Sequence, residues 1–195
     1  MLRMSRLSSD DCRALLDLAR RAISSAVIEK RILDFPSCPT VLTEPAGAFV
    51  TLHRNGQLRG CVGQVESPDP IAETVARAAI NAALHDSRFA AVEAGEVSSL
   101  EIEISVLGRP EPIAPEEILQ GHHGLLIVKR EHRGLLLPQV ATERRWSSQR
   151  FLEETCVKAG LPRDAWREPS TRVFAFAAEV FSDTSLRVGH SVGSE

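Results

Sequence analysis

Apolar residues recur every three or four positions after Ser8, and this spacing predicts an amphipathic helix near the start of the chain. Ser8 and Asp11 have the spacing of a capping box, while Leu7 and Cys12 have that of a hydrophobic staple. The apolar stripe of this helix consists of Cys12, Leu15, Leu16, Ala19, Ile23, Ala26 and Val27. Because these positions share one face, we expect the helix to pack against a core that includes Cys12.

A β-hairpin is predicted over residues 48–66, where two strand-like segments flank Asn55 and Gly56. This dipeptide tolerates the two positive φ angles of a type I′ turn. A two-residue turn pairs His53 with Leu58, Leu52 with Arg59, and Val50 with Cys61. Since strand side chains alternate between faces, this register places Arg59 and Cys61 on the face of Val50 and Leu52.

The rest of the chain shows helices and strands without a regular βαβ rhythm. Asp69-Pro70 is typical of a helix start, and a face of small residues continues from there to Leu84. The further elements expected are a strand at 100–107, a hairpin at 124–129 and 133–137, a helix at 144–159 and a strand at 173–181. Because the strands come in hairpins, the sequence predicts an α+β fold with a mostly antiparallel sheet and flanking helices. Residues 182–195 are expected to form a frayed tail.

Composition limits the classes of protein that the chain can belong to. Its 195 residues are 43% hydrophobic and 25% charged, which is typical of a globular protein of one domain, or of one domain with a small appended lobe. The net charge of −3 argues against a nucleic-acid partner, which usually leaves a basic footprint. No apolar run approaches the ~20 residues of a membrane helix, and the N-terminus lacks the apolar core of a signal peptide. We therefore expect a cytoplasmic protein without a membrane partner.

Cys61 is the thiol with the most unusual sequence surroundings. Of the four cysteines, Cys12 and Cys156 fall on apolar helix faces, and Cys38 lies in a loop that contains proline. Cys61 instead follows Arg59 and lies between Gly60 and Gly63. A nearby guanidinium favours the reactive thiolate. The glycines either leave room for a substrate or partner to approach or mark a bulge in the strand. The alternative is that Cys61 is a small buried residue in a tightly packed strand.

A second candidate site is the segment His85-Asp86-Ser87-Arg88-Phe89, which follows the small-residue helix. Asp86 and Arg88 are close enough in sequence to pair, and one charge is then presented to a cleft. The alternative is an ion pair that only ends the helix, since surface ion pairs often contribute little.

Cofactor chemistry has little support in the sequence. The six histidines form no HExxH or HxH pattern, and no Cys or His cluster has zinc-finger spacing. The phosphate-binding and dinucleotide-binding glycine patterns are absent, as is the nucleophile elbow of α/β-hydrolases. We expect neither a metal nor a cofactor.

The segment Leu58-Arg-Gly-Cys-Val-Gly63 resembles the Leu-Arg-Gly-Cys-Ile-Gly stretch of the AMMECR domain family. Asp86-Ser-Arg-Phe89 and the strand at 100–107 resemble further blocks of this family. The C-terminal block is matched in order by 134–141, Trp146, Phe151, Leu152, Cys156, 159–162 and Trp166. The resemblance covers residues 8–181, and the prokaryotic members called protein A of the AmmeMemoRadiSam system are the most similar. Val62 replaces the usual isoleucine, and Ala90-Ala91 stand where prolines are common.

The resemblance implies a single domain over residues 8–181, with a larger and a smaller lobe and a cleft near the Arg-Gly-Cys stretch. It also implies two protein partners, a radical S-adenosylmethionine protein and a Memo-like protein. It names no reaction, so whether the protein is an enzyme stays open. It does connect the blocks that contain Arg59, Gly60, Cys61, Gly63, Asp86 and Arg88.

Three hypotheses follow from these residues. In the first, Arg59 and Arg88 bind a small anionic ligand, and Cys61 acts as nucleophile or thiol carrier with His85 or His53 as base. In the second, the protein is a non-catalytic binding or scaffold protein whose hairpin at 124–137 contacts a partner. The third is a cysteine-dependent hydrolase or transferase with a Cys61–His85–Asp86 arrangement. It is disfavoured because neighbouring helix residues point about 100° apart. A separate prediction is that Arg59 or Arg88 makes a hydrogen-bonded contact with Asp86 and that Cys61 lies in the same depression. The alternative is that Asp86 is a solvated residue at the end of the helix.

Overall fold

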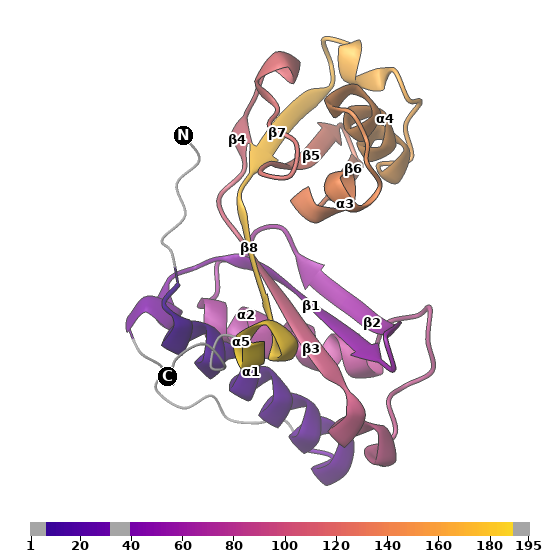
Figure 1. The fold of residues 1–195 in the computed structure, drawn as a ribbon. Coiled ribbons are helices and arrows are strands. Elements are labelled where there is room, and N and C mark those ends of the chain that lie inside the picture. The colour runs from indigo at the N-terminus through magenta and orange to yellow at the C-terminus, as the bar shows by residue number, and fades with distance from the viewer. Residues whose placement is uncertain (1–6, 32–39, 189–195) are drawn as a thin grey trace. The chain divides into compact units, whose positions relative to one another are not determined.

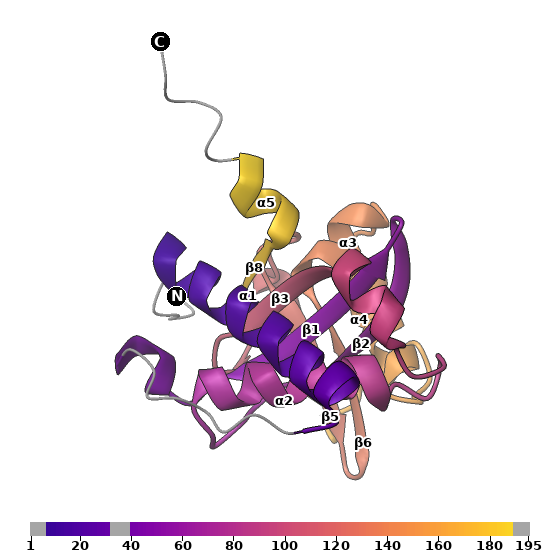
Figure 2. The ribbon, with the colours of Figure 1, turned by 90° about the horizontal axis from the view of Figure 1, so that it is seen from below.

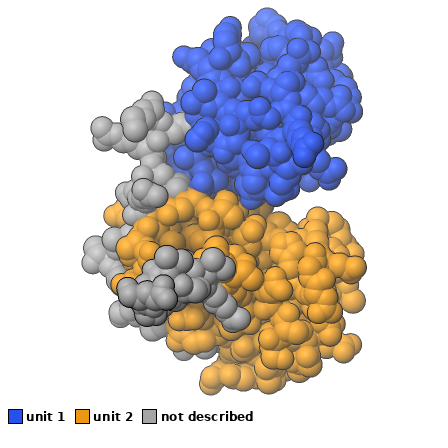
Figure 3. Space-filling view, in the orientation of Figure 1, with its two compact units in different colours: residues 1–4, 107–178 blue, residues 5–106, 179–195 orange. Residues whose placement is uncertain are grey.

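The structure is a computed structural model that describes residues 7–31 and 40–188. It divides into two compact units (Figure 3). Of the described residues, unit 1 contains 107–178, and the larger unit 2 contains 7–31, 40–106 and 179–188. Each unit has its own antiparallel sheet and its own buried core. The predicted α+β fold with a larger and a smaller lobe is therefore confirmed.

Unit 2 is a four-stranded sheet with two long helices (Figures 1 and 2). Its strands, in sheet order, are β2 (Gln57–Gln64), β1 (Gly47–Arg54), β3 (Glu101–Leu107) and β8 (Ala178–Ser182). The helix α2 (Ile71–Leu84) packs on β1 and β2, and α1 (Ser9–Ser24) packs on α2. The small residues of α2 allow this close approach, and nine of its residues are buried. A π-helical turn, Ser25–Glu29, extends α1, and a 3-10 helix, η2 (Thr40–Thr43), precedes β1.

The start of α1 agrees with its sequence pattern. The Ser8 hydroxyl accepts a hydrogen bond from the Asp11 N–H, and the Asp11 carboxylate accepts one from the Ser8 N–H, so the capping box is confirmed. Cys12 is buried in the core of unit 2, as predicted. Cys38 lies outside the described residues.

The hairpin of β1 and β2 forms at the predicted turn but with a different register. Asn55 and Gly56 have φ values of 52° and 74°, as a type I′ turn requires. His53 pairs with Leu58 as expected, but a β-bulge follows, and then Leu52 faces Gly60 and Thr51 faces Cys61. The predicted pairs Leu52–Arg59 and Val50–Cys61 are therefore wrong. The bulge adds one residue, Arg59, to β2 and so moves Cys61 to the opposite face of the sheet.

Unit 1 is built around a second four-stranded sheet. Its strands, in sheet order, are β4 (Glu111–Pro112), β7 (Arg172–Phe176), β5 (Gly124–Lys129) and β6 (His132–Leu136). Two helices, α3 (Pro138–Glu143) and α4 (Ser148–Lys158), pack with it, and α4 buries Phe151, Leu152 and Cys156. Three short 3-10 helices complete the two units: η3 (Ala94–Ser99), η4 (Pro115–Glu117) and η5 (Ala165–Arg167).

Three predicted elements differ from the structure. The helix expected at 144–159 begins only at Ser148 and is preceded by the separate α3. The strand expected at 173–181 is two strands, β7 and β8, which belong to different sheets. The expectation of a frayed tail is wrong for α5 (Asp183–Val188). The Asp183 carboxylate accepts hydrogen bonds from Arg20 Nη2 (2.5 Å) and from the Ile102 N–H (2.9 Å), which anchors the start of α5. Residues 189–195 lie outside the described chain.

In the described part of the chain, we find no helix with both the length and the apolar character that a bilayer crossing requires.

Candidate functional site

The candidate site lies on β2, which is an edge strand of the sheet in unit 2. Leu52 is fully buried, and its partner Gly60 lies directly beneath α2, where a Cβ atom on Gly60 would be 2.1 Å from the Ala82 carbonyl oxygen. Cys61 follows Gly60 and so points to the other face, away from α2. A Cβ atom on Gly63 would be 2.2 Å from the Ala48 carbonyl oxygen. Both glycines therefore allow backbone segments to pack closely.

Cys61 is joined to the Asp86 block through its own backbone. The Cys61 N–H donates to Asp86 Oδ2 at 2.8 Å, and Arg88 Nη2 donates to the Cys61 carbonyl at 3.2 Å. The thiol is half-buried, and its sulfur accepts a hydrogen bond from Thr51 Oγ1 at 3.3 Å. Asp86 and Arg88 thus occupy the backbone groups that another strand would take, which protects the edge of β2 at this point.

Asp86 and Arg88 form a closely bonded ion pair, and the predicted contact between Asp86 and an arginine is confirmed for Arg88. Arg88 Nε donates to Asp86 Oδ1 at 2.9 Å, and Nη2 donates to Oδ2 at 2.7 Å. The Arg88 hydrogen bonds, with smaller help from the Cys61 N–H, hold the pKa of Asp86 well below its usual range. The Asp86 side chain is only 6% exposed, whereas that of Arg88 is 55% exposed. The buried Asp86 carboxylate therefore fixes the position of the Arg88 guanidinium, and the Arg88 side chain is the part of the pair that faces solvent.

The Arg88 guanidinium, which donates to the Cys61 carbonyl, also interacts electrostatically with the Cys61 side chain. Asp86 is the main cause of the raised pKa of Arg88, and the Cys61 side chain adds a smaller contribution in the same direction. Arg88 uses Nε and Nη2 for the bonds described above. Its Nη1 donates to no oxygen among the residues that the structure describes.

In the part of the chain that the structure describes, Arg59 makes no hydrogen bond to Asp86, and its guanidinium is directed at Glu96 instead. Arg59 Nη2 and Nε donate to the two carboxylate oxygens of Glu96 at 2.9 and 3.1 Å. Its Nη1 and Nη2 also donate to the carbonyls of Ala90 (2.8 Å) and Ala91 (3.2 Å). Proline in place of these alanines offers the same carbonyls, so the departure from the family pattern leaves the hold of Arg59 on the loop intact. Arg59 thus uses four of its five N–H groups to hold the loop along β2.

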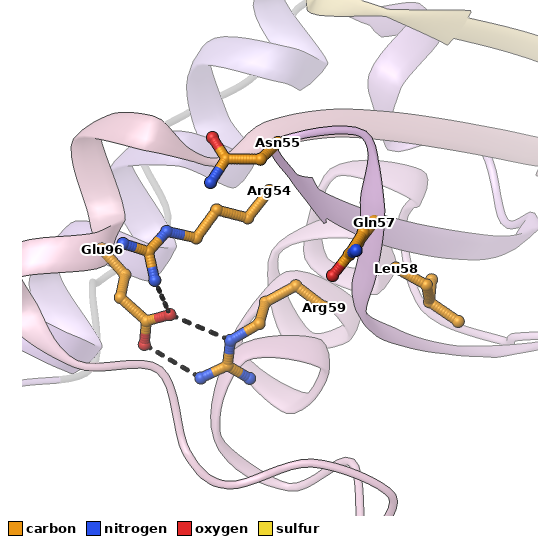
Figure 4. Close-up of a pocket in the computed structure, with 6 residues that line it drawn as sticks. All are labelled: Arg54, Asn55, Gln57, Leu58, Arg59 and Glu96. Atoms are coloured by element: carbon orange, nitrogen blue, oxygen red, sulfur yellow. Dashed lines mark hydrogen bonds and ion pairs between the residues drawn. The ribbon is translucent and has the colours of Figure 1, made fainter.

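Glu96 is the principal residue of this region that the sequence did not reveal. Its Oε1 also accepts a hydrogen bond from Arg54 Nη1 (2.8 Å), and its Oε2 accepts one from the Glu93 N–H (2.9 Å). The Arg59 hydrogen bonds lower the pKa of Glu96 to about 2, which keeps this carboxylate charged. Figure 4 shows both guanidinium groups directed at Glu96.

A hollow of about 320 Å³ lies beside this cluster. It is lined by Arg54, Asn55, Gln57, Leu58, Arg59 and Glu96. These residues come from the turn of the hairpin, the bulge of β2, and the 3-10 helix η3 (Figure 4). The hollow lies wholly within unit 2.

The two candidate bases are not engaged with the thiol. His85 is exposed and ends α2, where its N–H donates to the Asn81 carbonyl at 2.8 Å. Within residues 7–31 and 40–188, no hydrogen bond joins the side chain of His85 or His53 to Cys61 or Asp86. The Cys61–His85–Asp86 arrangement is therefore not assembled in this structure. The same part of the chain contains no group of three or more His, Cys, Asp or Glu residues that could hold a metal ion.

The other described cysteines are buried thiols. Desolvation raises the pKa of Cys12 to about 11, with further contributions from Glu179 and Asp11. Burial also raises the pKa of Cys156. Because the thiolate is the nucleophile, both residues are poor candidates for chemistry.

Comparisons with known proteins show sequence similarity over nearly the whole chain. The family model described as AMMECR1 matches residues 16–181. A protein of Methanothermobacter thermautotrophicus is 42% identical over 185 residues, which cover 91% of this chain and 96% of the relative. Protein TK0174 of Thermococcus kodakarensis is 42% identical over 92% of this chain and 94% of its own length. The crystal structure of an uncharacterized protein, PH0010 from Pyrococcus horikoshii, superposes with a TM-score of 0.83 at 40% identity, covering 89% of this chain and 92% of that one.

Proposed function

The chain belongs to the AMMECR1 family, and we propose that it is a binding protein whose working site is the surface formed by Cys61 and Arg88 at the edge of β2. The site takes a small anionic group, such as a carboxylate or phosphate, on the outward side of the Arg88 guanidinium. This keeps the predicted anionic ligand and assigns it to Arg88 alone, because four of the five N–H groups of Arg59 are taken by Glu96, Ala90 and Ala91.

The observation that supports this proposal most directly is the set of hydrogen bonds that fixes the Arg88 guanidinium. Asp86 fixes the Nε and Nη2 side of the guanidinium, and the Cys61 carbonyl takes a second bond from Nη2. The planar group therefore has one defined orientation, while more than half of its side chain stays exposed beside the thiol. A guanidinium held in this way matches the geometry of carboxylates and phosphates and loses little freedom when it binds one.

A hydrolase or transferase mechanism receives less support. Nucleophilic catalysis by a thiol needs a base within hydrogen-bond reach, and the described partner of the sulfur is the Thr51 hydroxyl. We therefore assign Cys61 a place in the binding site and no covalent step. The scaffold alternative, with a partner on the hairpin at 124–137, remains compatible with this assignment because β5 and β6 lie in the other unit.

Protection of Cys61 from alkylation tests the anion site. In a Cys38→Ser background, inorganic phosphate is expected to slow the modification of Cys61 by the neutral reagent iodoacetamide in a saturable way. Mass spectrometry assigns the label, and the buried Cys12 and Cys156, both with raised pKa values, are expected to react slowly. Arg88→Gln should abolish the protection, because the anion then loses its guanidinium.

Arg77→Gln is the matched control for this experiment. Arg77 lies on α2 in the same unit, is 53% exposed, and is ion-paired with Asp69. This variant should keep the protection. Protection that persists in Arg88→Gln, or that is absent from the unsubstituted chain, would contradict the proposed site.

We also propose that the protein acts in the cytoplasm together with a radical S-adenosylmethionine protein and a Memo-like protein. Support for these partners comes from the resemblance of the 58–63 and 86–89 blocks. Their copurification with the tagged full chain tests this proposal, and the failure of both to copurify would count against a stable complex.

A further inference from the structure

We propose that the hollow beside Glu96 is a second binding site of unit 2, and that it takes an organic anion: a carboxylate or phosphate that carries an apolar group. This site is independent of Arg88, since no residue is shared between the two. The geometry of the hollow and the unequal number of donors and acceptors around it point to this chemistry.

The hollow is lined by two cationic side chains and one anionic side chain. Among the residues that line the hollow, Arg54 and Arg59 face one carboxylate, that of Glu96, and Glu93, which does not line the hollow, also acts electrostatically on Arg59. The Glu96 oxygens accept four hydrogen bonds, from Arg54, from two nitrogens of Arg59 and from the Glu93 N–H. Since these acceptors are in use, Glu96 offers little to a cation. The two guanidinium groups that line the hollow therefore favour an anion.

The unused donors belong mainly to Arg54. Each side-chain nitrogen of Arg59 donates at least one hydrogen bond. In Arg54, only Nη1 donates a hydrogen bond to a described residue, and its acceptor is Glu96. Arg54 Nε is buried and has no hydrogen-bond partner, an arrangement that costs free energy unless a ligand or water supplies an acceptor. The Arg54 side chain is 41% exposed and lines the hollow, so its guanidinium is accessible to a ligand there.

The amides and the apolar wall complete the site. Asn55 and Gln57 are exposed on the turn of the hairpin, and their side chains make no hydrogen bond with any other described residue. Each can donate to an oxyanion that Arg54 holds. Leu58 is one of the exposed large hydrophobic residues of the chain and lines the hollow on the side away from Glu96 (Figure 4). An anion with an apolar substituent satisfies both features.

Binding of benzoate to the ¹⁵N-labelled full chain tests this inference by NMR. Saturable shifts are expected for the Arg54 Nε–H signal and for the side-chain amides of Asn55 and Gln57. Benzamide, which has the same ring without the charge, should leave these signals nearly unchanged. Phenyl phosphate in a parallel titration shows which oxyanion binds more tightly.

Variants locate the benzoate site. Arg54→Gln should weaken benzoate binding by about tenfold, equal to the loss of roughly 1.4 kcal/mol. Leu58→Ala should weaken it less, and Arg88→Gln and Arg77→Gln should leave it unchanged. Arg54→Gln retains the bonds between Arg59 and Glu96, and an unchanged amide spectrum outside the hollow confirms that it is folded. Equal shifts with benzamide, no saturable shift with either anion, or unaltered affinity in Arg54→Gln would overturn the proposal. Loss of binding in Arg88→Gln alone would place the anion at the Cys61 surface instead.

Discussion

Gly60→Ala is expected to lower the free energy of unfolding by about 3 kcal/mol or more, because the added methyl group has no room. Its Cβ would lie 2.1 Å from the carbonyl oxygen of Ala82 and 3.1 Å from its carbonyl carbon. These are backbone atoms of α2, so no flexible side chain can move aside, and the helix itself must shift away from β2. Urea unfolding followed by circular dichroism measures the loss.

Gly95→Ala is the matched control for this substitution. Gly95 lies in η3, has no atom within 4 Å of its Cβ position and does not have a positive φ angle. Its substitution should change stability by no more than about 0.5 kcal/mol. If Gly60→Ala were as stable as the unsubstituted chain, the close packing of α2 on β2 would be refuted.

Asp86→Asn is expected to destabilise the protein by about 2 kcal/mol at pH 7. The substitution removes a charged acceptor that serves Arg88 Nε, Arg88 Nη2 and the Cys61 N–H. An asparagine oxygen can satisfy one of these donors, but its NH₂ group then faces another donor. Because the Arg88 side chain is exposed, solvent screens part of its attraction to Asp86, and this limits the loss of stability on substitution.

The pH dependence of this effect has a defined sign. The folded state lowers the pKa of Asp86, so its contribution is present above the ordinary carboxyl pKa of ~4 and is lost as the pH falls through the lowered value. The stability difference between the unsubstituted chain and Asp86→Asn should therefore shrink as the pH falls from about 5 toward 2. Asp69→Asn, which alters the more exposed pair with Arg77, is the control and should cost less than about 1 kcal/mol. A constant difference across this pH range would show that the Asp86 charge is not what stabilises the fold.

The sequence predicted the hairpin turn because Asn55 and Gly56 are a strong local signal, but it could not predict the register beyond His53. Register is set by which residues are buried, and Gly60 has no side chain to mark the face that packs on α2. The bulge at Arg59 therefore left no trace in the hydrophobic pattern. This one inserted residue determines which face of the sheet Cys61 lies on and which residues Arg59 contacts.

Sequence distance explains the rest of the difference at the site. Asp86 and Arg88 are two residues apart, so their pairing could be anticipated from chemistry alone. Glu96 is 37 residues from Arg59, and nothing in the local pattern around Glu96 indicated that contact. Similarly, the apolar run at 173–181 gave no sign that it serves two sheets, because no turn residue interrupts it. Long-range contacts of this kind depend on the tertiary fold.

The rate ratio for two alkylating reagents at Cys61 tests the central claim most directly: that Asp86 fixes Arg88 beside the thiol as an anion-binding group. Iodoacetate and iodoacetamide have the same leaving group and differ in charge. In the Cys38→Ser background, the ratio of the iodoacetate rate to the iodoacetamide rate should fall roughly fivefold on Arg88→Gln, which corresponds to the loss of about 1 kcal/mol of attraction near the surface. Arg88→Lys should retain part of the ratio, and Arg77→Gln should leave it unchanged. A ratio that is the same with and without Arg88 would contradict the account.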